Sequence, residues 1–272
     1  MSENGDYVCK LKKALYGLKQ APRAWFSRLD NYLKQQGYKR GDIDNNLYMN
    51  IEDKYMIIVF VYVDYTIFGS NLQILSVNFA SEMKKELEMS MLGELTFFLG
   101  LQVYQTNKGI FISQTRYIKD MLKIFKMEDS KPISTLMITT CKLSKDDESL
   151  EVDHTMYRSM IGSLLYVIAT RPNVMQAIVF VPRFQSSPKE MHVTVVKRIF
   201  QYLRGTMEYG LWYPKSQDFI LKSFTDANWE GSVDDRKSTS GEELFLGNCL
   251  VSWLSKKQSS ISLYSRGRIH CY

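Results

Sequence analysis

Two aspartates that end or interrupt apolar stretches are the residues of this sequence best suited to metal-dependent chemistry. Asp64 follows an apolar run from Met56 to Val63, for which we predict a buried strand, and Asp226 lies in the segment Phe224-Thr225-Asp226-Ala227. A carboxylate among buried apolar residues is costly unless it is paired or binds a metal ion. Each pattern is also typical of a core strand that enters a turn or of a sheet edge, so these residues alone leave both interpretations open.

A second group of polar residues surrounds the start of a predicted helix. Gly17 permits close approach of a backbone, and Lys19, Gln20 and Arg23 carry donors suited to phosphates, sugars or a template base. Basic residues at a helix start are also ordinary solvated surface. Whether this group binds nucleic acid or only faces water stays open at this point.

Helices alternate with strand pairs along the part of the chain that must position these residues. Pro22 suits the first turn of a helix that continues to Gln36, and Gly37 ends it. This alternation predicts an α+β fold with antiparallel sheets. The next predicted elements are a hairpin over Tyr55–Phe68 that reverses near Asp64 and Tyr65, a helix over Asn78–Met89, and a second hairpin from Phe97–Tyr104 to Gly109–Ser113.

The second half of the chain changes from helices to strands. The polar segment Lys142–Asp153 predicts a linker or surface loop, and a mostly helical region follows it. Its clearest helix opens at Ser187-Pro188 and ends at Gly205. The strands predicted after that region are Phe219–Thr225, Glu242–Leu246 and Cys249–Leu254, with a turn at Gly247-Asn248.

Composition indicates a globular chain with room for a sizeable core. The length of 272 residues suggests two domains, and 45% of the residues are hydrophobic. The chain has 35 Lys and Arg against 29 Asp and Glu, which leaves a net charge of +6. That charge permits nucleic-acid binding without requiring it. The four cysteines are scattered, which indicates neither a zinc site nor a disulfide framework and favours a reducing compartment. The start lacks a signal-peptide pattern, and no apolar run approaches the roughly 20 residues of a membrane span, so we expect neither secretion nor membrane insertion.

The motifs together resemble the reverse transcriptase and ribonuclease H region of copia-type retrotransposon Pol polyproteins. The family writes Tyr-Val-Asp-Asp where this chain has Tyr62-Val63-Asp64-Tyr65. The likeness is collinear and covers nearly the whole sequence. It is carried by Ala14-Leu15-Tyr16-Gly17-Leu18-Lys19-Gln20-Ala21-Pro22-Arg23-Ala24-Trp25 and by segments 93–102, 109–114, 157–166 and 235–241.

The resemblance implies a polymerase site that has lost most of its carboxylates. Nucleotidyl transfer in this class uses two magnesium ions held by converging carboxylates, one from a strand upstream of the Ala-Leu-Tyr-Gly motif and two from the Tyr-Val-Asp-Asp turn. By resemblance, Asp64 is the one member present, because residue 1 already lies downstream of the first strand. Tyr65 stands at the third position, and a phenol, uncharged at neutral pH, is a poor magnesium ligand. Gly17, Lys19, Gln20 and Arg23 are expected to face the nucleotide and template.

The ribonuclease H site shows the same pattern of loss. Asp226 is expected to be the first carboxylate of its two-metal centre, and the family then requires a Glu and further acids from later helices. The segment 263–272 contains no acid. A short deletion in one encoding of the family tail, Leu-Ser-Thr-Ala-Glu-Ala-Glu-Tyr-Ile-Ala, yields this segment, so we interpret it as a frameshift.

We therefore interpret the chain as a truncated, degenerate copy of that region. The expected parts are a partial reverse transcriptase palm over residues 7–138, a helical thumb-and-connection-like region over 139–215, and the start of a ribonuclease H-like sheet over 216–272. We expect an ancestral RNA-directed DNA polymerase with ribonuclease H, now without efficient catalysis. Its ancestral cofactor is magnesium, with binding impaired at Asp64 and Asp226, and its ancestral partner is an RNA or DNA template-primer.

Two alternatives remain from the sequence. The basic surface of the chain could still bind nucleic acid without catalysis, or a partner polypeptide could supply the missing Asp strand and complete a working enzyme. An expressed chain is expected inside the cell, in the cytoplasm or nucleus. The sequence predicts no oligomeric state.

Overall fold

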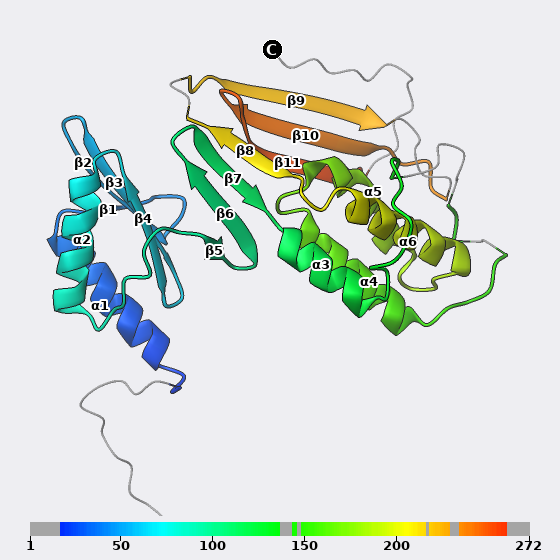
Figure 1. The fold of residues 1–272 in the computed structure, drawn as a ribbon, viewed down its shortest axis with the longest axis horizontal. Helices are drawn as coiled ribbons and strands as arrows, with labels where there is room; N and C mark the ends of the chain where they lie inside the picture. The colour runs from blue at the N-terminus through cyan, green and yellow to red at the C-terminus, as the bar shows by residue number, and fades with distance from the viewer. Residues whose placement is uncertain (1–16, 137–142, 146–147, 216–217, 229–233, 260–272) are drawn as a thin grey trace, which may run out of the picture. The chain divides into compact units, whose positions relative to one another are not determined.

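The computed structural model describes residues 17–136, 143–145, 148–215, 218–228 and 234–259. The chain divides into two compact units, residues 1–95 and 96–272, and each has its own hydrophobic core. Across the described residues the fold is mixed α+β, with three antiparallel sheets and six α-helices (Figure 1), as the sequence predicts. The three-part domain division with boundaries after residues 138 and 215 stays a prediction.

The first unit is a four-stranded antiparallel sheet with two helices. Helix α1 (Ala21–Gln35) leads into β1 (Lys39–Arg40), β2 (Leu47–Glu52), β3 (Tyr55–Tyr62) and β4 (Tyr65–Ser70), which pair in that order, and α2 (Gln73–Glu86) follows. Both helices contribute to one core, through Leu29 and Leu33 of α1 and Phe79 and Met83 of α2. These side chains pack with residues of one face of the sheet, so both helices cover the same face.

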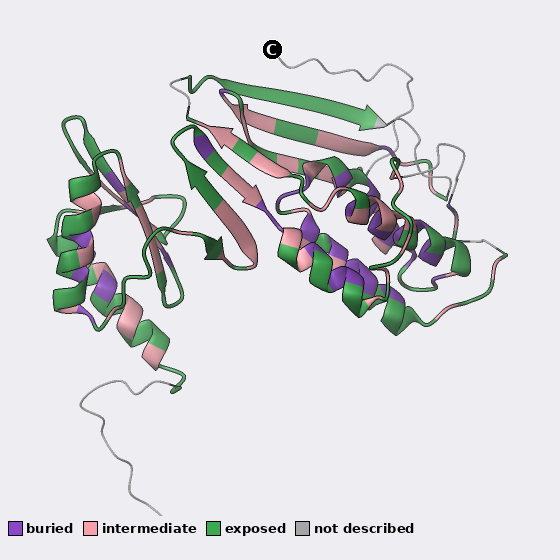
Figure 2. Ribbon diagram, in the orientation of Figure 1, coloured by how far each residue is buried: buried purple, intermediate pink, exposed green. Residues whose placement is uncertain are grey.

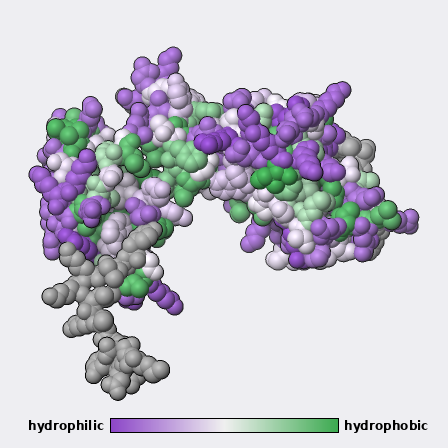
Figure 3. Space-filling view, turned by 60° about the horizontal axis from the view of Figure 1, so that its bottom comes forward, coloured by the Kyte–Doolittle hydropathy of each residue, from purple (hydrophilic) through white to green (hydrophobic). Residues whose placement is uncertain are grey.

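Strand β3 lies between β2 and β4, and alternate residues of it are buried. Ile57, Val59 and Val61 are at most 4% exposed and face the helices, as the period of two in a strand requires. The intervening residues project from the other face, where no described helix packs. On that face Met56 and Tyr62 are exposed, and Ile51 of β2 is 61% exposed. Apolar side chains are accordingly visible at the molecular surface (Figure 3).

The second unit has a helical core. Helices α3 (Thr115–Ile124), α4 (His154–Val167), α5 (Met175–Phe180) and α6 (Glu190–Gly205), with two short 3-10 turns at Pro172–Val174 and Val181–Phe184, bury most of their apolar residues against one another. Figure 2 shows this buried centre. None of the described helices is long and apolar enough to cross a bilayer.

Two sheets accompany this helical core. One has the order β5 (Phe97–Phe98), β6 (Leu101–Thr106), β7 (Gly109–Ser113) and β8 (Gly210–Pro214), so it joins strands from both ends of the helical region. The other has the order β11 (Cys249–Lys257), β10 (Thr239–Leu246) and β9 (Leu221–Asn228). In both sheets, each described neighbour is antiparallel.

Most predicted elements are confirmed, with shifted ends. The helix after Pro22, both hairpins, the helix that ends at Gly205 and the last three strands are all present. The predicted helix over Asn78–Met89 is shifted, since α2 begins at Gln73 and ends at Glu86. The described part of Lys142–Asp153 has no helix or strand, as expected for a loop, but Leu143 is buried in the core. The segment interpreted as a frameshift, residues 263–272, lies outside the described residues.

Candidate functional site

The β3–β4 hairpin places the first candidate carboxylate at its tip. Tyr62 pairs with Tyr65, so Val63 and Asp64 form the two-residue turn between the strands. Asp64 is exposed. The expectation that it lies among buried apolar residues is therefore wrong, because the strand ends at Tyr62 and the turn projects beyond the core. Burial imposes no need for a partner or a metal on this carboxylate.

The turn has an unusual backbone at Val63. Its φ is 55°, in the left-handed region that β-branched residues rarely adopt. Positive φ at the first central position of a two-residue hairpin is the arrangement for which glycine is preferred. Strain of this kind persists where the surrounding structure imposes it, and it is frequent at functional sites.

Tyr65 is the first residue of β4 and lies beside Tyr62 on one face of the hairpin. The two side chains are 50% and 39% exposed, respectively. The sequence correctly predicts a reversal near Asp64 and Tyr65, although Tyr65 itself already belongs to the strand. The tip thus presents one carboxylate and two phenol rings.

The second group of predicted site residues lies at the start of α1. Gly17 has a φ of +87°, and Lys19, Gln20 and Arg23 are all exposed. Among the described residues, no hydrogen bond or ion pair engages the side chains of Lys19, Gln20 or Arg23. Figure 1 draws the first turn of α1 and the β3–β4 turn at the same end of the unit. Residues 14–16 of the same motif lie outside the described residues.

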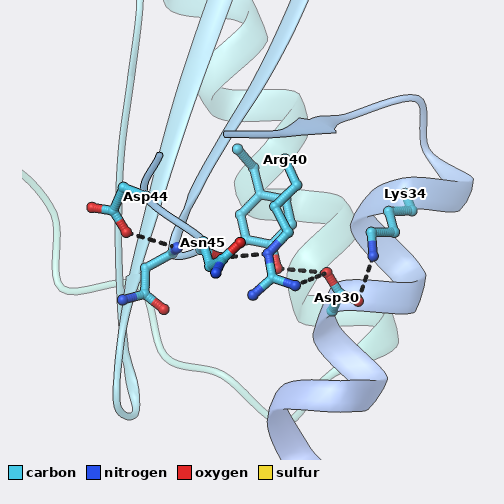
Figure 4. Close-up of polar contacts among 7 residues, drawn as sticks. Asp30, Lys34, Arg40, Asp44 and Asn45 are labelled. Carbon is cyan, nitrogen blue, oxygen red and sulfur yellow. Dashed lines mark hydrogen bonds and ion pairs between the residues drawn. The ribbon is translucent and has the colours of Figure 1, made fainter. Parts of the chain in front are cut away.

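A partly buried polar network holds α1 against the sheet (Figure 4). The Tyr48 hydroxyl, which is fully buried, donates to Asp30 Oδ1 over 2.7 Å, and Lys34 Nζ lies 2.8 Å from Asp30 Oδ2. Arg40 Nη1 lies 3.8 Å from Asp30 Oδ1, while Arg40 Nε donates to the carbonyl of Asn45 over 2.6 Å. Arg23 lies near the start of α1, and Lys19 and Gln20 come just before it. This network therefore holds in place the helix that carries these predicted site residues.

The network perturbs the ionisation of its two central residues. Burial is the largest influence on Asp30 and raises its pKa, but hydrogen bonds from Lys34 and Tyr48 and the charges of Lys34 and Arg40 together hold the pKa below its usual 3.8. Burial, followed by the hydrogen bond to Asp30, raises the pKa of Tyr48. Sequence reasoning missed this network; its one local indication was the spacing of Asp30 and Lys34, one helical turn apart.

The second candidate carboxylate lies in the other unit. Asp226 is exposed in β9, which is exposed along its described length (Figure 2), and its Oδ1 accepts a hydrogen bond from the backbone N–H of Ala227 over 2.9 Å. Asp226 pairs with Gly241 and Phe224 with Glu243, so Asp226 and Glu243 project from the same face of the sheet. Both line a cavity of about 420 Å³ beside α5, together with Gln176 and Trp253. Glu243 was not singled out from the sequence.

Neither location gathers the ligands that a two-metal centre requires. Within the described parts of the chain, no three His, Cys, Asp or Glu side chains come together in a group that could hold a metal ion. Paired divalent cations need several converging oxygen ligands to offset their charge. The residues present at the hairpin tip and in β9 therefore do not fit a two-magnesium site.

Comparison with known proteins identifies relatives along nearly the whole chain. The family model for reverse transcriptase (RNA-dependent DNA polymerase) matches residues 1–139. The retrovirus-related Pol polyprotein from transposon RE1 of Arabidopsis thaliana is 38% identical over 94% of this chain, and that from transposon TNT 1-94 of Nicotiana tabacum is 35% identical over 94%. These matches span 18% and 20% of the two relatives.

A shorter relative is matched over most of its own length. The putative transposon Ty5-1 protein of Saccharomyces cerevisiae is 30% identical over 95% of this chain and 84% of its own. No solved structure matches the chain.

Proposed function

The chain belongs to the reverse transcriptase family of copia-type retrotransposon Pol polyproteins, and from this premise we propose that it is a catalytically impaired descendant of their polymerase and ribonuclease H region. In the proposal, residues 7–138 derive from the polymerase palm. Residues 139–215 correspond to the thumb and connection, and strands β9–β11 to the opening of ribonuclease H.

The single observation that carries this proposal is the composition of the β3–β4 tip. The turn presents Asp64 beside Tyr65, and no group of three metal-binding side chains occurs among the described residues. A polymerase of this class needs magnesium to lower the pKa of the attacking hydroxyl and to hold the triphosphate. A phenol in place of a carboxylate leaves the turn short of negative charge, so nucleotidyl transfer should be lost.

The proposal extends to the ribonuclease H portion. Strands β9, β10 and β11 form an antiparallel meander, and Asp226 lies on its outer strand. Asp226 and Glu243 share one face, but hydrolysis by paired metal ions requires further carboxylates. We propose that this site is also impaired.

Primer extension tests the proposal. The full chain is incubated with a template-primer, nucleotides and magnesium, beside the Asp64→Ala variant. The proposal predicts that both proteins give the same background. Extension by the wild-type chain that disappears in Asp64→Ala would overturn it. Repeating the assay with candidate partner polypeptides tests whether a second chain completes the site.

Residual nucleic-acid binding is a second candidate function. It is supported by the unengaged side chains of Lys19, Gln20 and Arg23 and by the net charge of +6. Contacts to phosphate must weaken linearly with the logarithm of salt concentration. Filter binding across a salt series therefore tests this candidate, and flat or absent binding removes it.

A further inference from the structure

Three aromatic side chains lie next to one another across one sheet of the second unit. The register pairs Tyr104 of β6 with Phe111 of β7, and Phe111 with Trp212 of β8. Residues directly opposite in antiparallel strands project from the same face, so Tyr104, Phe111 and Trp212 form one aromatic row. Tyr104 is 68% exposed and Trp212 is 44% exposed. Among the described aromatic residues, none is in ring contact with a member of this row.

Two glycines let these rings lie close to the sheet. A Cβ on Gly109 would lie 2.9 Å from Trp212 Cζ2, and a Cβ on Gly210 would lie 2.9 Å from Phe111 Cζ. At each glycine the ring, together with still closer backbone atoms of the neighbouring strand, occupies the space that a side chain would fill. A ring supported by backbone on one side can offer its other face to a ligand.

The opposite face of the sheet is partly buried at β8. Tyr213 projects from that face, as does its partner Ile110. Burial raises the pKa of Tyr213, and the nearby Cys249 of β11 adds to the effect. The half-buried Tyr213 thus lies on the side away from the aromatic row, where Ile110 is 38% exposed.

Cationic residues lie beyond both ends of the strands that carry the aromatic row. Lys108 and Lys215 are exposed and are held next to each other by a hydrogen bond from the Lys215 N–H to the Lys108 carbonyl, 2.8 Å long. At the other end the Arg116 N–H donates to the side chain of Gln102 over 2.7 Å, and Gln102 lies on the same face as Tyr104. Within the described residues, none of these three cations makes an ion pair.

We propose that the aromatic row is a binding surface for single-stranded nucleic acid, with bases stacked on Tyr104, Phe111 and Trp212 and phosphates held by Lys108, Lys215 and Arg116. Stacking on aromatic rings with flanking positive charge is the general mode of single-strand recognition. Neighbouring strands are about 4.8 Å apart, so the row spans roughly 10 Å, enough for two or three bases.

The geometry favours a single strand over a duplex. The base faces of a duplex are covered by their neighbours in the stack, whereas a single strand can place them on protein rings. This inference names the ligand of the second candidate function and rests on it. It does not depend on any residual polymerase activity.

The test measures binding of the full chain to a fluorescein-labelled thymidine oligonucleotide of about 15 nucleotides, a length within the usual single-strand site sizes. Fluorescence anisotropy compares the wild type with Tyr104→Leu/Trp212→Leu, which removes two rings but keeps apolar side chains. The matched control is Tyr55→Leu, which removes a ring that is 41% exposed at the end of the β2–β3 hairpin in the first unit. Circular dichroism melting confirms that each variant folds.

The proposal predicts a distinct pattern. Loss of two stacking rings should raise the Kd at least tenfold, since each stacked base contributes about 1–3 kcal/mol, while Tyr55→Leu should leave the Kd unchanged. Oligonucleotide binding should also quench tryptophan fluorescence in the wild type, and Trp212→Phe should bind with much less quenching. A duplex of the same length should bind more weakly.

Each negative result of the binding assay identifies which proposal is wrong. Absence of binding by the wild type would remove both this inference and the nucleic-acid-binding candidate. Wild-type binding that the double variant retains in full would overturn the aromatic row alone. A double variant that binds normally but changes the oligomeric state in sedimentation would likewise overturn it and assign the surface to self-association.

Discussion

Removing the Asp30 carboxylate is expected to destabilise the first unit more than removing any of its exposed partners. In Asp30→Ala the fully buried Tyr48 hydroxyl loses its acceptor, which costs about 1–3 kcal/mol for a buried unsatisfied group. Loss of the Lys34 pair adds about 0.3–0.5 kcal/mol, because Lys34 is 49% exposed and the pair is one helical turn apart. The expected total is about 1.3–3.5 kcal/mol.

Two companion variants separate these contributions. Lys34→Ala should cost no more than about 0.5 kcal/mol. The double variant Asp30→Ala/Tyr48→Phe should be less destabilised than the sum of its single variants, because no hydroxyl is then left buried without a partner. This non-additivity follows from direct contact between the two side chains (Figure 4).

Hydrogen exchange on the full chain is the appropriate assay, since it reports α1 and β2 separately from the second unit. Amides of α1 should exchange faster in Asp30→Ala by the factor that corresponds to the lost stability, about thirtyfold or more for 2 kcal/mol or above. Equal effects of Asp30→Ala and Lys34→Ala would refute the reasoning. Strict additivity in the double variant would refute it as well.

Two further predictions concern pH and the glycines. The folded-state pKa of Asp30 is lowered, so its contribution to stability is complete above the unfolded pKa of about 3.9 and disappears as pH falls through the folded pKa. Asp30→Asn should therefore flatten the acid limb of the pH profile of α1 hydrogen exchange. An unchanged acid limb would contradict this. Gly210→Ala should lower the free energy of unfolding by about 1–3 kcal/mol, because its Cβ would clash with the Ile112 carbonyl oxygen. Gly162→Ala, at an open position of α4, should raise the free energy of unfolding by about 0.5–1 kcal/mol. Urea unfolding measures both variants, and a change of the same sign in the two would contradict this reasoning.

The elements predictable from sequence are those whose cause is local. Helix α1 follows from Pro22, the apolar spacing and Gly37, and the β3–β4 hairpin follows from two apolar runs around a short turn. The start of α2 was misplaced because its N-cap, Leu72, has an extended backbone and no side-chain cap, so the sequence contains no start pattern there. Strand β10 begins at Thr239, earlier than predicted, because its first residues are held by pairing with β9 and β11.

The sequence predicted which residues form the candidate site, but not how exposed they are. Asp64, Tyr65 and the basic residues around Gly17 were named from the sequence, and the structure places Asp64 at an exposed turn. How far a hairpin projects beyond the core depends on the surrounding helices, which an apolar run cannot reveal. The contact between Asp30 and Tyr48 joins separate elements, so no local pattern predicts it.

Magnesium-dependent primer extension by Tyr65→Asp tests whether the β3–β4 tip has lost two-metal catalysis. Restoring one acid gives the turn two neighbouring carboxylates, but no third metal-binding side chain joins them among the described residues. Partial repair of a cooperative site should recover almost nothing. We expect Tyr65→Asp to give extension at the background level of Asp64→Ala. Magnesium-dependent synthesis by Tyr65→Asp that disappears on adding Asp64→Ala would contradict it.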